Sequence, residues 1–167
     1  GLAAHDLERV AQGIEEVLDP NYLRSREADA AYFAELVTNA GVDIVQPPGI
    51  HALYLNAGRL LPHIPPHGFP GHALACEMYL TGGVRCVELG SLYLGKFDEN
   101  HNLIEPAPFE LVRMAIPRRT YTQAHLEYVA DVLADIAKNP DRVASYRVVD
   151  APKLLRHFNL KLERIPA

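Results

Sequence analysis

The sequence has few of the features that mark secreted, membrane or nucleic-acid-binding proteins. Only two cysteines, Cys76 and Cys86, occur in 167 residues, too few for a disulfide framework, so we expect both thiols to be reduced. The net charge is −5 and no basic stretch interleaves with aromatic residues, so no nucleic acid partner is expected. The apolar runs are short, and the run 129–133 contains Asp131, so no membrane span is expected. No charged segment followed by an apolar core opens the chain, as a secretory signal would. We therefore expect a cytoplasmic protein.

What is present is enough apolar material for one core, arranged with two different periods. Hydrophobic residues make up 49% of the chain, which suits one ordinary domain rather than two. Apolar residues recurring at three- and four-residue steps predict helices, and alternating ones predict strands. The predicted helices cover 2–18, 20–40, 57–61, 69–80, 122–138 and 152–158. The predicted strands cover 42–46, 51–56, 84–89, 111–116 and 145–149, and 95–108 is predicted to be a loop.

These elements predict an α/β fold of the α+β sandwich type. Short strands interspersed with helices favour a small, mostly antiparallel sheet with helices packed on one face. Two long helices before the first strand are unusual at the start of a self-sufficient domain. Residues 1–40 are therefore predicted to connect to a domain upstream, and residues 41–167 to form the small domain itself.

Three histidines lie close together in the proline-rich segment LPHIPPHGFPGH. Their spacing could bring metal ligands together, and His72 with Cys76 at i, i+4 on a helix could share an ion. His63 and His67, however, sit among prolines, and an exposed turn often carries such residues. The spacing alone leaves both interpretations open.

Arg113 is the most informative polar residue. In LVRMAIP, strand alternation places Arg113 opposite the face of Val112 and Met114. A guanidinium in an apolar strand must meet an anion or reach water, and its shape suits a carboxylate held by two parallel hydrogen bonds. An internal ion pair with an Asp or Glu of the chain is the alternative.

Two further histidine positions are candidates. His157 and Phe158, in LLRHFNLKL, could form a pocket wall that stacks on a flat ligand, or could be a core phenylalanine beside a solvated histidine. His51 follows a proline-glycine turn, where it could face a cleft or simply lie on the surface. No Ser-His-Asp pattern, Walker loop or dinucleotide glycine fingerprint occurs.

Four segments together resemble one known family. RLLPHIP, FPGHALACEMYLTGGVRCVELGSLYLG, ELVRMAIPRRTYTQAHLEYV and PKLLRHFNLKL, in that order, resemble the C-terminal part of tryptophanase, a pyridoxal-phosphate β-eliminating lyase related to tyrosine phenol-lyase. The likeness covers essentially the whole chain. It implies the small C-terminal domain of a fold-type I pyridoxal-phosphate enzyme, whose parent reaction converts L-tryptophan to indole, pyruvate and ammonia.

The resemblance assigns roles to individual residues. It implies that Arg113 binds the substrate α-carboxylate, and that the catalytic candidate His157 lies with Phe158 beside the indole. Leu89 stands where tyrosine phenol-lyase carries an arginine, which favours indole over phenol. His51 matches a family histidine, which implies a substrate-binding role, although this chain has Ile50 where the family usually has a second glycine before that histidine.

The resemblance also settles the histidine-rich segment in favour of a turn. The family has a proline-histidine turn that His63 fits, whereas His67 and His72 fall where the family does not typically keep histidine. No metal site is therefore implied within this chain.

The resemblance further implies that part of the enzyme lies elsewhere. Such enzymes hold pyridoxal phosphate on a lysine that follows another lysine, and none of Lys96, Lys138, Lys153 and Lys161 has that context. The cofactor site and a K⁺ site are expected in an upstream large domain, in a homotetrameric parent. The isolated chain is then expected to be inactive. The alternatives are a stand-alone module that binds an amino acid or a protein, and a lyase acting on tyrosine or another β-substituted amino acid.

Overall fold

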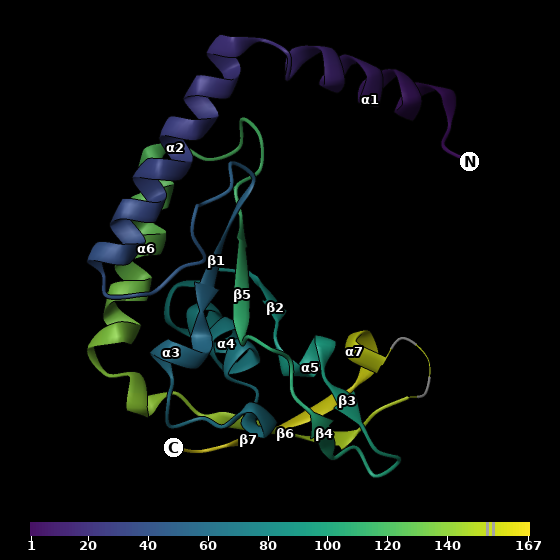
Figure 1. Cartoon of the computed structure of the whole chain (residues 1–167), viewed down its shortest axis with the longest axis vertical. Coiled ribbons are helices and arrows are strands. Elements are labelled where there is room, and N and C mark those ends of the chain that lie inside the picture. Colours follow the sequence, from purple (N-terminus) through teal and green to yellow (C-terminus); the bar gives the residue numbers. More distant parts are fainter. Residues whose placement is uncertain (153, 155) are drawn as a thin grey trace.

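The computed structural model of the chain describes residues 1–152, 154 and 156–167 (Figure 1). The helices are α1 (Ala4–Glu16), α2 (Pro20–Asn39), α3 (Ala57–Leu60), α4 (Pro70–Gly82), α5 (Ser91–Leu94), α6 (Gln123–Lys138) and α7 (Arg156–Asn159), with 3-10 turns η1 (Pro66–Gly68) and η2 (Pro140–Arg142). The strands are β1 (Ala52–Asn56), β2 (Val87–Leu89), β3 (Lys96–Phe97), β4 (Leu103–Glu105), β5 (Leu111–Ala115), β6 (Ser145–Asp150) and β7 (Lys161–Ile165).

The central sheet has three antiparallel strands in the order β1-β5-β2. Arg113 in the middle strand pairs with Tyr54 on one side and Val87 on the other. Two separate antiparallel ribbons, β3-β4 and β6-β7, complete the strands. The α+β fold with small antiparallel sheets is confirmed.

The core lies on one face of this sheet, between the strands and the long helices. Alternate residues of β1 and β5 point into it, and α2, α4 and α6 supply the opposing side chains. The central members are fully buried: Phe33, Val37, Leu53, Leu55, Leu74, Met78, Val112, Leu133 and Ile136. The opposite face of the sheet is the uncovered face: its residues Tyr54, Val87 and Arg113 are half-buried or exposed in the described structure.

Local signals explain where α4 and α6 begin and end. Pro70 occupies the first turn of α4, where a missing N–H costs nothing, and Gly83 ends the helix with a left-handed φ of 67°. Thr122 and His125 form a reciprocal capping box at the start of α6. Both helices were predicted with the help of Pro70, Gly83 and Thr122, whereas the part played by His125 appears only in the structure.

Arg26 joins α2 to the chain segments beside the sheet, a role that was not predicted from the sequence. It is 8% exposed, and its Nη2 donates to the carbonyl of Ile50 at 2.7 Å and to that of Ile116 at 2.5 Å. A buried guanidinium here has carbonyl oxygens as partners in place of a carboxylate. It therefore binds the two chain segments that flank β1 and β5.

The first helix, α1, stands away from the rest of the molecule (Figure 1). None of its residues is buried, and its apolar residues Leu7, Val10 and Ile14 are each more than half exposed. Its C-terminal end is held by Glu16, which accepts from Arg118 at 2.6 Å and lies 3.4 Å from Arg119.

Three sequence predictions were wrong in detail. Residues 42–46 form no named strand, because Ile44 makes a single bridge to Leu55 before the prolines interrupt the pairing. The predicted loop 95–108 contains the β3-β4 ribbon. The predicted helix 152–158 is, in its described part, the single turn α7, and Lys153 and Leu155 lie outside the described residues. Strand β7 follows, whose mostly exposed side chains hide its pairing with β6.

Candidate functional site

The uncovered face of the central sheet carries the predicted carboxylate-binding arginine. Tyr54, Arg113 and Val87 form one row across the three strands. Arg113 and Tyr54 are half-buried, and Val87 is 51% exposed.

Arg113 has no ionic partner within the part of the chain that the structure describes. It makes no hydrogen bond, ion pair or ring contact there, although its side chain is half-buried. The alternative of an internal ion pair is therefore not realised among these residues. A half-buried guanidinium without a partner is available to an anion.

Leu89 lies on the same face as Arg113, two pairs further along the sheet. It pairs with Leu111 at the end of β2 and is half-buried. The chain then turns at Gly90 into α5. Leu89 therefore lies on the same side of the sheet as Arg113, two residues beyond Val87, which pairs with Arg113.

His157 and Phe158 lie on α7, which docks beside α5. The His157 ring meets Tyr93 of α5 edge-on with a centroid separation of 4.5 Å, and lies 4.0 Å from the Phe158 ring. Phe158 is 74% exposed. The neighbouring Arg156 lies 3.6 Å over the Phe97 ring, which helps to hold the short helix in place.

His51 lies at the other end of the sheet. It precedes β1, and its carbonyl accepts from Ile116 just beyond β5, whereas Leu89 pairs with Leu111 where β5 begins. The four strand steps from 111 to 115 correspond to about 13 Å. The structure therefore groups Leu89 with the α5–α7 end and leaves His51 apart from it.

The three histidines of the proline-rich segment face different partners. The His63 ring contacts the Val143 carbonyl at 3.1 Å and Asp141 at 3.5 Å, whereas His67 is exposed on η1. His72 Nε2 lies 3.4 Å from Cys76 Sγ. Among the described residues, no three or more His, Cys, Asp or Glu side chains gather as metal ligands.

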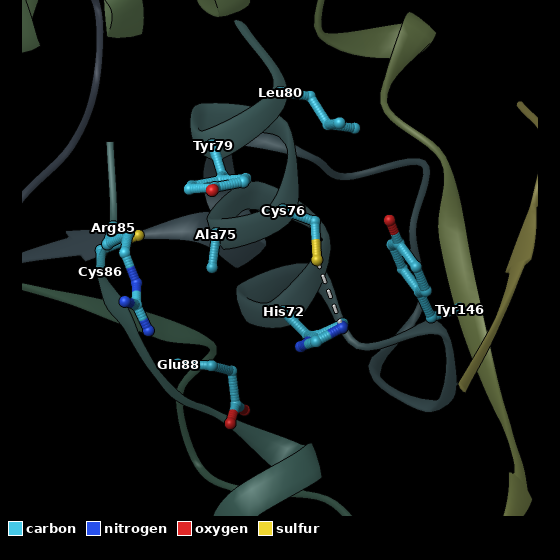
Figure 2. A pocket seen from close by; sticks show the side chains of 9 residues that line it. All are labelled: His72, Ala75, Cys76, Tyr79, Leu80, Arg85, Cys86, Glu88 and Tyr146. Atoms are coloured by element: carbon cyan, nitrogen blue, oxygen red, sulfur yellow. Dashed lines mark hydrogen bonds between the residues drawn. The ribbon is translucent and has the colours of Figure 1, made fainter. Parts of the chain in front are cut away.

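The His72–Cys76 pair lines a hollow of about 380 Å³ beside α4. Figure 2 shows the two side chains pointing toward each other, with Tyr146 facing them from β6 and the Arg85 guanidinium extending toward Glu88. Burial lowers the pKa of His72 and raises that of Cys76. Burial also raises the pKa of the Cys86 thiol to about 12. The thiols and imidazole of this hollow are therefore uncharged at neutral pH.

Two carboxylates, the half-buried Glu88 and the buried Glu110, were not singled out from the sequence. Burial, and further the charge of Glu110, raises the pKa of Glu88 to about 7, although a hydrogen bond from the Gly90 amide opposes the shift. Burial also raises the pKa of Glu110. The available signal was strand alternation, which places Glu88 on the inward face, opposite to Leu89.

No described lysine fits a covalent cofactor site. Lys96, Lys138 and Lys161 are all well exposed and each forms an ion pair with a surface carboxylate, while Lys153 lies outside the described residues. The lysines that the structure describes thus offer no buried amine for a pyridoxal group. In the same described part, no helix has the length and apolar character needed to cross a bilayer.

Comparison with known proteins identifies relatives along nearly the whole chain, although no protein-family model matches it. The tryptophanase of Hyphomonas neptunium is 44% identical over 165 residues, which is 99% of this chain and 36% of the relative. The tryptophanase of Salinibacter ruber is 44% identical over 97% of the chain and 34% of its own length. The tyrosine phenol-lyase of Pasteurella multocida is 43% identical over 98% of the chain and 35% of its own length.

These relatives give the chain its class: over nearly its whole length it is similar to proteins named tryptophanase and tyrosine phenol-lyase, and it matches only part of each. More narrowly, the chain resembles the C-terminal part of a tryptophanase, with tyrosine phenol-lyases also among its relatives. It spans about a third of the length of the curated relatives it matches. The resemblance drawn from its motifs is confirmed.

Proposed function

We propose that this chain is the part of a lyase that closes over the bound substrate, and that the lyase converts L-tryptophan to indole, pyruvate and ammonia. The observation that carries the proposal is Arg113, half-buried and without an ionic partner on the open sheet face of the described structure. A guanidinium can hold the α-carboxylate through two parallel hydrogen bonds. Holding that group would fix the direction of the substrate's α-C–H bond, which orients the bond for cleavage.

Leu89, His157 and Phe158 would shape the side of the site that receives the indole. Leu89 offers an aliphatic surface, and Phe158 an exposed ring that a flat aromatic group can cover. His157 can donate or accept a hydrogen bond or move a proton beside that group. His51, at the far end of the sheet, would contact substrate only if the rest of the protein brought the ligand across the open face.

The cofactor would come from the part of the protein that this chain does not contain. Pyridoxal phosphate, held there, would serve as the sink for the electrons released when the α-proton leaves. We also place the K⁺ site of the parent enzyme there. This chain's residues would bind the carboxylate, line the aromatic pocket and exclude water when the domain closes.

The outward-facing helix α1 supports a connection to that missing part. Its exposed row of Leu7, Val10 and Ile14 covers nothing of the described chain, and an amphipathic helix of this kind is typical of a docking surface. We propose that residues 1–40 lead from the large domain into the small domain 41–167, with α2 also contributing Phe33 to the core. A cytoplasmic homotetramer is the assembly we expect for the whole protein.

A chimera tests the function directly. This chain would replace the matching 36% of the Hyphomonas neptunium tryptophanase, and indole formation from tryptophan would be measured with pyridoxal phosphate present. We expect indole from the chimera and none from the 167-residue chain alone. An inactive but folded and cofactor-loaded chimera, or activity of the isolated chain, would refute the proposal.

The role of Arg113 is tested in the same chimera. Arg113→Met should lower kcat/KM by roughly 100-fold, because a desolvated charge pair that loses one partner costs about 2–5 kcal/mol. Arg59→Met is the matched control, since Arg59 is exposed and pairs with Asp43. Equal effects of the two substitutions would argue against carboxylate binding by Arg113.

A second candidate is β-elimination of tyrosine to phenol, which the 43% identity to a tyrosine phenol-lyase supports. Supplying the chimera with tyrosine and measuring phenol separates the two. Leu89 and His157 favour tryptophan, so we expect indole formation to dominate. Dominant phenol formation would transfer the proposal to the second candidate.

A further inference from the structure

The half-buried Glu88 and the buried Glu110 accept hydrogen bonds from successive amides of the turn that follows Leu89. Glu88 Oε1 accepts a hydrogen bond from the Gly90 amide at 2.6 Å, and Glu110 Oε1 accepts one from the Ser91 amide at 3.0 Å. Glu110 is only 7% exposed, and its Oε2 atom is buried without a hydrogen-bond partner of normal geometry in the described residues. A buried carboxylate oxygen without a hydrogen-bond partner costs folding free energy unless it accepts a hydrogen bond or carries a proton.

Both carboxyl groups lie close to Gly90 and to Gly71. A Cβ on Gly90 would overlap Glu110 Oε2 and would lie 2.9 Å from Glu88 Oε1. A Cβ on Gly71 of α4 would lie 3.0 Å from Glu88 Cγ and 3.7 Å from Glu110 Oε2. Glycine at both positions therefore leaves room for the two carboxyl groups beside the same turn.

No cation neutralises this pair within the described part of the chain. Neither carboxylate forms an ion pair there. The titratable groups that line the hollow of Figure 2 with Glu88 are His72, Cys76 and Tyr79 from α4, Arg85 and Cys86 before β2, and Tyr146 from β6. Of these, only Arg85 is charged at neutral pH, and it is exposed at the edge of the hollow. On the Glu110 side, the groups supplied by α5 and α4 are the Ser91 hydroxyl and amide and the Gly71 amide.

We infer that Glu88 and Glu110 share a single proton and act together as positioning residues for the wall that carries Leu89 and His157. Two adjacent carboxylates in a buried site cannot both stay charged, and a shared proton supplies the donor that Glu110 Oε2 lacks. Leu89 immediately precedes the turn, and α5 immediately follows it, with Tyr93 touching His157. The carboxyl pair therefore holds the turn between Leu89 and α5, and through that turn it positions both segments.

The raised pKa values of both groups agree with this geometry. Glu88 lines the hollow, so the shared proton exchanges with solvent through it. Loss of the proton at alkaline pH places two like charges across the Gly90 turn, which pushes apart the segments bearing Leu89 and Glu110. The inference rests on the proposed function only in treating Leu89 and His157 as part of the substrate pocket.

The test follows the 167-residue chain by NMR without substrate, so that its outcome is independent of the lyase proposal. The signals are the Glu side-chain carboxyl carbons, the Leu89 methyl groups and the Ser91 amide. We expect the carboxyl carbon shifts to titrate near pH 7. The chemical shifts of the Leu89 methyl groups and the Ser91 amide should change with the same midpoint. Both Glu88→Gln and Glu110→Gln, which imitate a permanently neutral carboxyl, should abolish that step and keep Leu89 at its low-pH position. The control Glu99→Gln, at an exposed loop residue, should leave the step unchanged.

Two results would overturn the inference. One is a pair of carboxyls that both titrate like exposed glutamates, near the ordinary value of about 4.3. The other is a titration near pH 7 that Leu89 and Ser91 do not follow. Where either glutamine variant fails to fold, the other variant and the titration of the unsubstituted chain decide the outcome. In the active chimera, Glu110→Gln should also flatten the alkaline limb of the kcat/KM profile, which a merely structural residue would not change.

Discussion

Replacing Glu88 by glutamine should change how the stability of this chain depends on pH. In the unfolded chain the carboxyl takes its ordinary pKa of 4.5, whereas burial raises the pKa to about 7 in the fold. Between these values the folded state binds more protons than the unfolded state, so the free energy of unfolding falls as pH rises through the window. At 1.36 kcal/mol per pH unit, the difference corresponds to about 3 kcal/mol.

The assay is urea denaturation followed by circular dichroism at several pH values from about 5 to 8. Glutamine stays neutral throughout, so Glu88→Gln should gain up to about 3 kcal/mol relative to the unsubstituted chain as pH rises across this range. Most of the gain should be complete just above pH 7. Other titrating groups, including His72 with its lowered pKa, contribute to both proteins and largely cancel in the difference.

The exposed Glu99 supplies the control, because Glu99→Gln should give a curve parallel to that of the unsubstituted chain. A constant stability difference between Glu88→Gln and the unsubstituted chain over the whole pH range would refute the reasoning. It would mean that Glu88 is charged in the fold at neutral pH and that its surroundings do not lower the free energy of unfolding when it ionises.

Three further outcomes follow from the packing. Arg26→Met should lower the free energy of unfolding by about 3 kcal/mol, measured in urea, because the carbonyls of Ile50 and Ile116 lose a buried charged donor; an unchanged midpoint would contradict this. Leu133→Ala, at a fully buried core position, should cost about 3 kcal/mol by calorimetry, and a cost below about 1 kcal/mol would show that the core is not packed as described. Cys86, whose pKa is raised by burial to about 12, should react with a disulfide reagent at mildly alkaline pH at least ten times more slowly in the folded chain than in urea; equal rates would show that this thiol is not protected.

The helices were predictable because their signals are local. Proline in the first turn of α4, glycine after it and the capping threonine of α6 act within a few residues of the chain. The strands β1 and β5 were predictable for a similar reason, since alternation of apolar residues reports a half-buried strand directly. Their antiparallel pairing, centred on Tyr54 and Arg113, appears only in the fold.

Strand β6 was predicted over 145–149, but the ribbon β3-β4 and strand β7 escaped prediction because most of their side chains are exposed. A strand such as Lys161–Ile165 has no buried face to impose a clear apolar alternation, and its backbone pairing with β6 stabilises it instead. The segment 42–46 failed in the opposite way. It has an apolar alternation, but Pro47 and Pro48 stop the pairing after one bridge.

The sequence by itself determined the class of this protein and the identity of its candidate site residues. Long ordered motifs carry that information without reference to space, and the relatives confirm the family resemblance. Only the tertiary structure decided which polar groups have partners. Among the described residues it left Arg113 without one, gave Arg26 two carbonyls, and placed both Glu88 and Glu110 beside Gly90. Alternation along a strand says which residues share a face, but burial and pairing depend on what the rest of the chain lays over that face.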